Sequence, residues 1–445
     1  MAAQDRDRAV ARLQALVRIP TVSNRDPALV DASVFDEFLA ELARQFPVLH
    51  ERLELTGIDT HGLLFHWPGT SSERPVVLMA HLDVVPVDDG APWQHPPFGA
   101  EIHDGAVWGR GTLDDKGQLV AICEAVETLL GQGFSPAQDV WLSFGCNEEV
   151  SGPAATLAVE ELTRRGVRPW FVMDEGGAIA AEAFHGVTAP IGVVGVTEKG
   201  VTSLELRVDG RGGHASTPAR MGPTARLARA ITRLDRSPMP ASVPAPTVEL
   251  LRRMAPHASI ALRPLMANAA RLRPVLTRAL VIAGPESAAT TRTTFAITTL
   301  SGSPALNVIA STARAGVNIR IMVGDTVAEV LAHVRKAVSD DQVEIDVIEQ
   351  NEPSPVSPID DDAFRLIEST ISEVFPDAVP APYVMMAATD SRFFTTICDR
   401  VYRFAPFRMT KAQRESIHSY DEHLGVDAYV DGVRWYQRLI ERIPG

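Results

Sequence analysis

The sequence has few cysteines, and their placement matches no common cysteine chemistry. Cys123, Cys146 and Cys398 are odd in number and share no metal-binding or redox spacing, which suits a reducing compartment. Free cysteine is commonly buried, so we expect all three in the core. Cys146 lies two residues before Glu148, and the alternative for it is a position facing a site.

Long apolar runs and basic clusters are also missing. No segment approaches the roughly 20 apolar residues that span a bilayer, and the charged N-terminus lacks the apolar stretch of a signal peptide. The net charge is −14, without a Lys/Arg cluster. These features argue against nucleic acid and membrane partners and predict a cytoplasmic protein. They do not exclude a small anionic substrate, because one local arginine can outweigh a distant net charge.

A chain of 445 residues exceeds what one hydrophobic core usually supports, so two domains are expected. Short apolar runs alternate with helical patterns in the first half, which predicts an α/β domain. We predict strands at 75–80, 140–145, 170–173 and 400–404. We predict helices at 10–18, 33–45 and 117–130.

The pattern changes after Lys199, where residues 203–209 alternate between polar and apolar, as in an antiparallel strand with one wet face. The elements that follow are predicted at 223–234 (helix), 292–300 and 313–321 (strands), 326–338 (helix) and 343–349 (strand). This order is that of a ferredoxin-like α+β domain with an insertion at about 237–290, partly helical and without an assigned role. The expected division is 1–198 and 352–445 for the α/β domain and 199–351 for the inserted domain.

Groups that bind metals follow several of the predicted strands. His81-Leu82-Asp83 ends one, Asn147-Glu148-Glu149 follows another, and Asp174-Glu175-Gly176 follows a third. Open α/β sheets place their ligands at the carboxyl edge of the strands. In the first motif the strand period of two points both side chains the same way, so Asp83 is expected to hold the second nitrogen of a metal-binding His81.

The acids divide into different tasks. Asp114 lies in the glycine-flanked run 109–117, where one carboxylate can bridge two cations, and we expect Asp114 and Asp115 also to cap the helix that follows. Glu148 and Glu149 diverge on an extended backbone, so one can bind metal while the other takes a proton from metal-bound water. Of Asp174 and Glu175, only one need be a ligand.

His418, in Ile417-His418-Ser419, completes the donor set of a dinuclear metal site. Imidazole and carboxylate ligands without thiolate suit two Zn²⁺ ions, with Co²⁺ or Mn²⁺ as substitutes. Such a pair can activate water and polarise a carbonyl, so amide hydrolysis is the expected reaction.

Five separated motifs, in order, resemble the dinuclear zinc peptidase family of aminoacylases, acetylornithine and succinyl-diaminopimelate deacylases and carboxypeptidase S. The resemblance implies a zinc-peptidase α/β catalytic domain with an inserted ferredoxin-like lid and dimerisation domain. Its implied metal ligands are His81, Asp114, Glu149, Glu175 and His418. It implies that Glu148 is the general base, that Asp83 supports His81, and that Glu175 is favoured over Asp174.

The resemblance extends to the second domain. His214, in Gly212-Gly213-His214, matches a loop that reaches the partner subunit's active site, which implies a homodimer. The implied substrate-binding residues are Asn307, Arg320, Thr389 and Arg392, with Arg320 holding a substrate carboxylate. Ala387 and Ala388 depart from the glycine usual before this Thr-Asp pair, which puts the fit of that loop in question.

The Asp-Glu-Gly-Gly-Ala stretch and the long insertion resemble the carboxypeptidase S and N-acyl-amino-acid hydrolase branch. The expected substrate is an N-acyl amino acid or small peptide with a free carboxylate, cleaved by a metal-bridging water that Glu148 activates. The alternatives are a dipeptidase acting on free dipeptides and a catalytically silent homologue that binds a metabolite.

Overall fold

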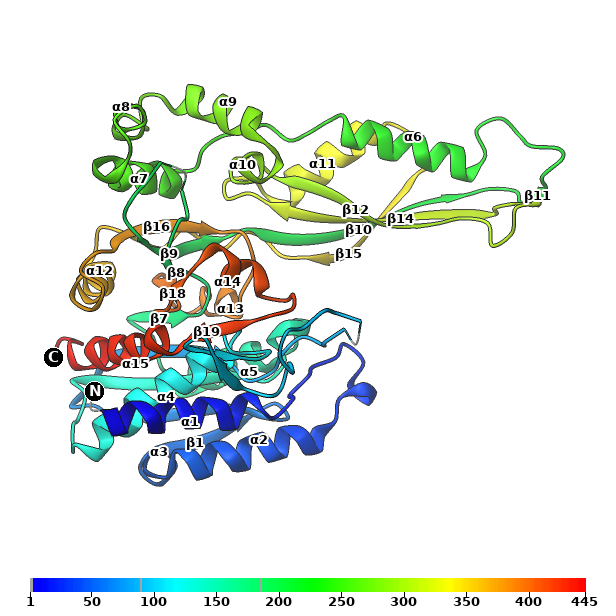
Figure 1. The fold of residues 1–445 in the computed structure, drawn as a ribbon. Coiled ribbons are helices and arrows are strands. Elements are labelled where there is room, and N and C mark those ends of the chain that lie inside the picture. The colour runs from blue at the N-terminus through cyan, green and yellow to red at the C-terminus, as the bar shows by residue number, and fades with distance from the viewer. Residues whose placement is uncertain (1–2, 89, 185) are drawn as a thin grey trace.

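The computed structural model describes residues 3–88, 90–184 and 186–445. A large mixed sheet forms the lower part of the molecule, and a smaller four-stranded sheet lies above it (Figure 1). The two sheets belong to an α/β catalytic domain and an α+β lid, so the predicted fold class is confirmed.

The large sheet has ten strands in the order β1-β2-β6-β3-β7-β17-β9-β8-β18, with β16 also paired to β9. Their bounds are β1 (Glu54–Ile58), β2 (Gly62–Trp67), β3 (Ser71–His81), β6 (Gln138–Gly145), β7 (Phe171–Asp174), β8 (Ala178–Ala180), β9 (Ile191–Glu198), β16 (Val379–Met385), β17 (Val401–Arg403) and β18 (Arg408–Met409). The neighbours β6, β3 and β7 run parallel, so their carboxyl ends meet at one edge.

Helices cover both faces of this sheet because its central strands are apolar on both sides. In β3, Val76 and Leu78 join the core on one face, while Val77 and Met79 join the core on the other. The first face is covered by α1 (Ala3–Val17), α2 (Ala32–Gln45), α3 (Pro47–Arg52), α4 (Lys116–Gly131), α12 (Asp362–Val374) and α15 (Val426–Glu441). The second face is covered by α5 (Ala154–Arg164) and α13 (Ser391–Phe394).

The lid has the predicted β-α-β-β-α-β order. Its elements are β10 (Gly200–Asp209), α6 (Pro223–Asp235), β12 (Thr294–Ser301), β14 (Thr312–Ile321), α11 (Val327–Val338) and β15 (Glu344–Gln350). The sheet order is β12-β14-β10-β15, all antiparallel. Alternate residues of β10, among them Leu204 and Leu206, pack against the two helices. The other face of the sheet looks toward the catalytic domain (Figure 1).

The insertion between α6 and β12 is helical, as the sequence partly predicted. It holds α7 (Ala245–Met254), α8 (Arg263–Ala267), α9 (Arg273–Ala283) and α10 (Pro285–Ala289). Leu250 and Met254 of α7 pack against the β16 edge of the large sheet, so the insertion rests on the catalytic domain.

Two smaller sheets accompany the two main ones in the described part of the chain. A short sheet joins β19 (His423–Gly425), β5 (Ala106–Trp108) and β4 (Glu101–His103), next to α14 (Lys411–Ser416). A two-stranded ribbon of β11 (Gly213–His214) and β13 (Val308–Ile309) forms the far tip of the lid (Figure 1).

The three cysteines are free and buried, as predicted. No helix in the described part of the chain has the length and apolar character needed to cross a membrane.

Candidate metal centre and substrate cavity

Three neighbouring parallel strands deliver the predicted motifs to one edge of the large sheet. His81 is the last residue of β3, Gly145 ends β6 directly beside it, and Asp174 ends β7. The strands are buried because they are apolar, and polar side chains begin where the apolar runs stop. The predicted meeting of these motifs is therefore what the structure shows.

Asp83 contacts both His81 and the acidic turn. The Nδ1 atom of His81 lies 3.0 Å from the Asp83 carbonyl and 3.4 Å from its Oδ1 atom. The Asp83 carboxylate also accepts hydrogen bonds from the backbone N–H groups of Glu148 (3.1 Å) and Glu149 (3.2 Å). Asp83 thus fixes the ring of His81 and the backbone of the Glu pair together.

Asp114 lies between two histidines. Its Oδ1 is 2.9 Å from Nε2 of His81, and its Oδ2 is 2.9 Å from Nε2 of His418. Burial would raise the pKa of Asp114, but the hydrogen bonds from His418 and His81 outweigh it and lower that pKa. His418 also lies 3.0 Å from Glu149, and its bonds to Asp114 and Glu149 raise its pKa to about 10.

The Glu pair lies in a 3₁₀ turn, η2 (Glu148–Val150), so the extended backbone predicted here is wrong. The turn forms because the Asp83 carboxylate accepts hydrogen bonds from the backbone N–H groups of both glutamates. Burial raises the pKa of Glu148 well above its usual range; His81 opposes this, and Asp390 and Glu149 add to it. A carboxyl group with a raised pKa is a better proton acceptor, which suits a general base.

Asp174 and Glu175 have different surroundings. The Asp174 carboxylate is buried and accepts a hydrogen bond from the Ser391 N–H at 2.9 Å. Burial raises the pKa of Glu175, and the neighbouring Asp114 and Asp115 raise it further. Both acids are thus close to the acid cluster, since Asp174 raises the pKa of Asp115, and Asp174 in addition holds the start of α13.

Neither Asp114 nor Asp115 caps the following helix, so that prediction is wrong. The capping position of α4 is Asp115, and its side chain makes no capping hydrogen bond. Its Oδ2 instead accepts from the His81 N–H at 3.2 Å, because Asp115 is buried beneath β3.

A cavity of about 310 Å³ opens above this cluster, between the catalytic domain and the lid. One wall carries Glu148, Glu149 and His418. The lining also includes two arginines, Arg320 from the lid strand β14 and Arg392 from α13. The cavity therefore joins the acid cluster to two arginines from different domains.

The two arginines carry positive charge that their protein neighbours only partly balance. Burial lowers the pKa of Arg320; Glu349 opposes this shift, and the nearby Arg392 adds to it. The Nε atom of Arg392 is buried and finds no hydrogen-bond partner among the described residues. Lys199 also lines the cavity, and burial beside Arg320 lowers its pKa to about 8. An anionic group of a ligand would pair with these positively charged side chains.

Thr389 does not line the cavity. Its side chain is buried, and its N–H and hydroxyl both donate to Glu198, at 3.0 Å and 3.2 Å. Glu198 in turn pairs with the buried Arg403 at 3.0 Å. Thr389 therefore holds Glu198, and it is Glu198, not Thr389, that lines the cavity.

His214 and Asn307 lie together, but far from the cavity. Both are exposed at the lid tip, where the Ala215 N–H donates to the Asn307 carbonyl at 3.1 Å. Neither residue lines the cavity of its own chain. A role for either in catalysis requires a second chain.

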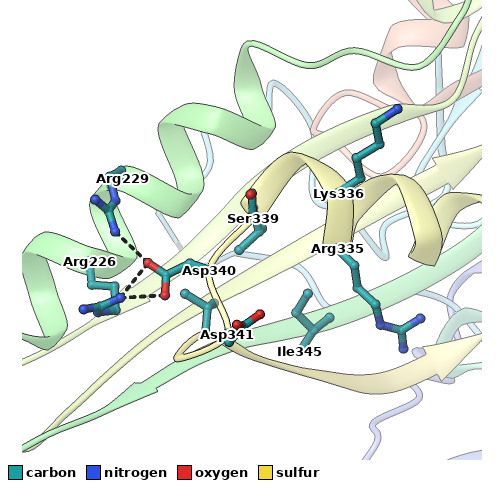
Figure 2. Close-up of a pocket in the computed structure, with 10 residues that line it drawn as sticks. Arg226, Arg229, Arg335, Lys336, Ser339, Asp340, Asp341 and Ile345 are labelled. Atoms are coloured by element: carbon teal, nitrogen blue, oxygen red, sulfur yellow. Dashed lines mark hydrogen bonds and ion pairs between the residues drawn. The ribbon is translucent and has the colours of Figure 1, made fainter.

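A larger hollow, of about 830 Å³, lies between α6 and α11 on the lid (Figure 2). Two of its arginines are already paired, because Arg226 and Arg229 both donate to Asp340, at 2.6 Å and 2.7 Å. Among the described residues that line it, none is a histidine. We therefore assign the site to the smaller cavity.

Sequence reasoning missed the group that holds the Asp114 loop. Glu422 is buried and accepts hydrogen bonds from the N–H groups of Gly111, Leu113 and Asp114, at 3.1, 2.8 and 3.2 Å. It also pairs with Arg110 at 2.6 Å. No local pattern links Glu422 to residues some 310 positions earlier, so the sequence offered no signal for it.

Asp390 was also missed. It lies beside Thr389, and burial together with Asp174 raises its pKa to about 7, against the opposing charge of Arg392. It raises the pKa of Glu148 in turn. Asp390 lies in the sequence between Thr389 and Arg392, which were both predicted as site residues, and this position was a signal that Asp390 belongs to the site.

Comparison with known proteins decides the family. Residues 77–442 match the sequence profile described as Peptidase family M20/M25/M40. The chain belongs to this family. It is 36% identical over 416 residues to a probable carboxypeptidase S-like 2 of Dictyostelium discoideum, covering 92% of this chain and 78% of that one. It is 34% identical over 449 residues to the N-fatty-acyl-amino acid synthase/hydrolase PM20D1 of Xenopus tropicalis, covering 99% and 87%.

The fold agrees with this assignment. The crystal structure of the M20 metallo-carboxypeptidase Sso-CP2 from Sulfolobus solfataricus superimposes with a TM-score of 0.71, at 16% identity, over 97% of this chain and 98% of that one. The family resemblance predicted from the motifs is thus confirmed, and the chain is an M20-family metallohydrolase.

The donor set fits a metal pair. Ligand atoms of His81, Asp114 and Glu149 all lie within 4.8 Å of one another. The buried Oε1 atom of Glu149 has no hydrogen-bond partner within the described ranges, and each oxygen of Asp114 faces a different histidine. Divalent cations would satisfy these groups.

Proposed function

We propose that this M20-family enzyme hydrolyses the amide bond of N-acyl amino acids or small peptides that carry a free carboxylate. The observation that carries the proposal is the single cavity that joins Glu148 to Arg320 and Arg392. A small substrate that places its amide beside the acid cluster and its carboxylate beside the arginines would fit this cavity. The names of the relatives, carboxypeptidase S-like and N-fatty-acyl-amino acid hydrolase, support this class.

Two Zn²⁺ ions are the proposed cofactor, held by His81, Asp114, Glu149, Glu175 and His418. Imidazole and carboxylate donors suit zinc, with Co²⁺ or Mn²⁺ as substitutes. When bound, such a pair supplies Lewis-acid polarisation of the carbonyl and activation of water. Asp114 is proposed to bridge the two positions, because its two oxygens face His81 and His418 separately.

Glu148 is proposed as the general base and takes the proton of the attacking water. Burial raises the pKa of the Glu148 carboxyl group, which makes it a better proton acceptor, and Asp83 fixes the backbone of Glu148. The same proton can then pass to the leaving amine, as general acid–base catalysis requires.

Arg320 and Arg392 are proposed to bind the substrate carboxylate. Guanidinium groups grip a carboxylate through paired, charge-assisted hydrogen bonds. Ala387 and Ala388 line the same cavity, and Thr389 supports it through Glu198. His214 and Asn307 are proposed to act on the partner's site in a homodimer. A cytoplasmic location stays a prediction.

The test is a panel of N-acetyl and long-chain N-acyl amino acids, matched amides without the carboxylate, and free dipeptides, each with and without added Zn²⁺. The proposal predicts metal-dependent cleavage of the carboxylate-bearing N-acyl amino acids over the matched amides. Cleavage confined to free dipeptides would move the assignment to dipeptidase. No cleavage of any compound would favour a silent metabolite-binding homologue.

A further inference from the structure

A second group of metal-binding side chains lies on the short β19-β5-β4 sheet, outside the cavity. Glu101 and His103 are two residues apart on β4, so both side chains point to the same face. Nε2 of His103 lies 2.8 Å from Oε2 of Glu101. His95 comes from the preceding loop, and ligand atoms of all three residues lie within 4.8 Å of one another.

Aromatic rings hold this group in place. The ring of His95 lies flat on the ring of His103, with centroids 3.7 Å apart and planes at 5°. The other neighbour of His95 is Trp108, at 4.8 Å in an edge contact, and Trp108 stacks on His423 at 4.2 Å. Side chains that are already packed lose less conformational entropy when they bind a ligand.

The donor chemistry is that of a transition-metal site. Two imidazoles and one carboxylate suit Zn²⁺, which binds such ligands at about 2.0–2.2 Å and leaves the fourth position of a three-ligand site to water. At those bond lengths, tetrahedral ligand atoms lie about 3.4 Å apart. Metal binding therefore requires the Glu101–His103 pair, now at 2.8 Å, to open slightly and ligand atoms that are farther apart, within 4.8 Å, to draw in. The two rings must also tilt from parallel, because a metal lies in the plane of each imidazole that binds it.

We propose that His95, Glu101 and His103 bind one divalent transition-metal ion, of which Zn²⁺ fits best, as a third cation site on the catalytic domain. None of the three lines the substrate cavity or belongs to the proposed metal pair. The site is therefore independent of the proposed function.

A metal ion at this site would hold the neighbouring segment, which contains Gln94 and His95, in place. Gln94, next to His95, donates from its backbone N–H (2.7 Å) and its side-chain amide (2.8 Å) to the carboxylate of Asp421. Asp421 lies in the loop that carries His418. A metal bound to His95 and to β4 would cross-link this segment to the short sheet and stabilise the folded chain by mass action.

The first experiment measures zinc content. The wild type, His103→Gln and the surface control His257→Gln are dialysed against the same micromolar free zinc and analysed by metal mass spectrometry. The proposal predicts about one zinc ion fewer per chain in His103→Gln alone, with hydrolysis retained. Added zinc should raise the melting temperature of the wild type and of the control by more than that of His103→Gln, which keeps only the proposed catalytic pair. Equal zinc contents in all three proteins would overturn the proposal.

A second measurement uses only the wild type, so it does not depend on the variant folding. Carbethoxylation of histidines is followed by peptide mass spectrometry while zinc is added. The proposal predicts that zinc protects His95 and His103, and unchanged labelling of both would overturn it. Protection of His81 and His418 reports separately on the proposed catalytic pair, so the two failures are distinguishable.

Discussion

Replacing Glu422 with Gln should weaken the metal centre without touching any of its proposed ligands. Glu422 is buried, neutralises Arg110 at 2.6 Å and accepts three backbone N–H groups of the loop that carries Asp114. The glutamine amide keeps the size and one acceptor but loses the charge. Removing one partner of a buried ion pair costs about 3–5 kcal/mol of stability. Groups that orient a metal ligand typically contribute about 10–100-fold to metal affinity.

The assay combines urea unfolding with zinc release to a competing chelator. We expect Glu422→Gln to lose stability in the range above and to release zinc more readily. Arg110→Met should also destabilise the fold, because it leaves Glu422 buried and without its counter-ion. The double variant should cost less than the sum of the two single changes by about 1–3 kcal/mol, since both charges are gone.

The matched control is Glu415→Gln, a surface glutamate on α14 that pairs only with the exposed Lys411 among the described residues. An exposed pair of this kind contributes about 0–1 kcal/mol, so the control should behave as the wild type does. The reasoning would be refuted if Glu422→Gln matched that control in both stability and zinc release, or if the two changes simply added.

Further predictions concern the cavity and the lid. Arg320→Met should lower kcat/KM for carboxylate-bearing substrates about 30-fold, equivalent to about 2 kcal/mol for a lost charged hydrogen bond. The control Arg314→Met, on the same strand, should leave kcat/KM unchanged. An equal loss of kcat/KM for the matched amides would count against a contact between Arg320 and the substrate carboxylate. The pKa of Lys199 is lowered to about 8, so its charge is present below pH 8 and lost above it, and KM should rise through that range in the wild type but not in Lys199→Met. If His214 acts on its partner, mixing inactive His214→Ala with inactive Glu148→Gln should restore hydrolysis; a fully active monomer would contradict this.

The neighbouring strands β6, β3, β7 and β17 of the catalytic sheet, and the elements of the lid, were predictable because their signals are local. Apolar runs ending in His81 or Asp174 indicate buried strands with polar groups at their carboxyl ends, and the alternation in residues 203–209 indicates a half-exposed lid strand. The strands β1, β2, β8, β9, β16 and β18 of the large sheet and the short sheet were not predicted. The two strands β1 and β2 have weak patterns, because packing against β6 and the helices determines them.

Within the site, the ligand motifs were predictable and their supports were not. Asp83 and Asp114 stand in recognisable motifs, whereas Glu422 reaches the Asp114 loop only through the folded chain. The orientation of Thr389 depends on the buried pair of Glu198 and Arg403, whose partners are about 200 residues apart. Contacts of this kind follow from tertiary packing, and a single sequence contains no local sign of them.

The most direct test of the central claim is Glu148→Gln, measured for both metal content and turnover. The account predicts that the variant keeps the same zinc content as the wild type, because Glu148 is not among the proposed ligands, and that kcat falls by about 10²–10⁴-fold, the usual contribution of a general base. Activity close to the wild type in a fully metal-loaded Glu148→Gln would contradict the account.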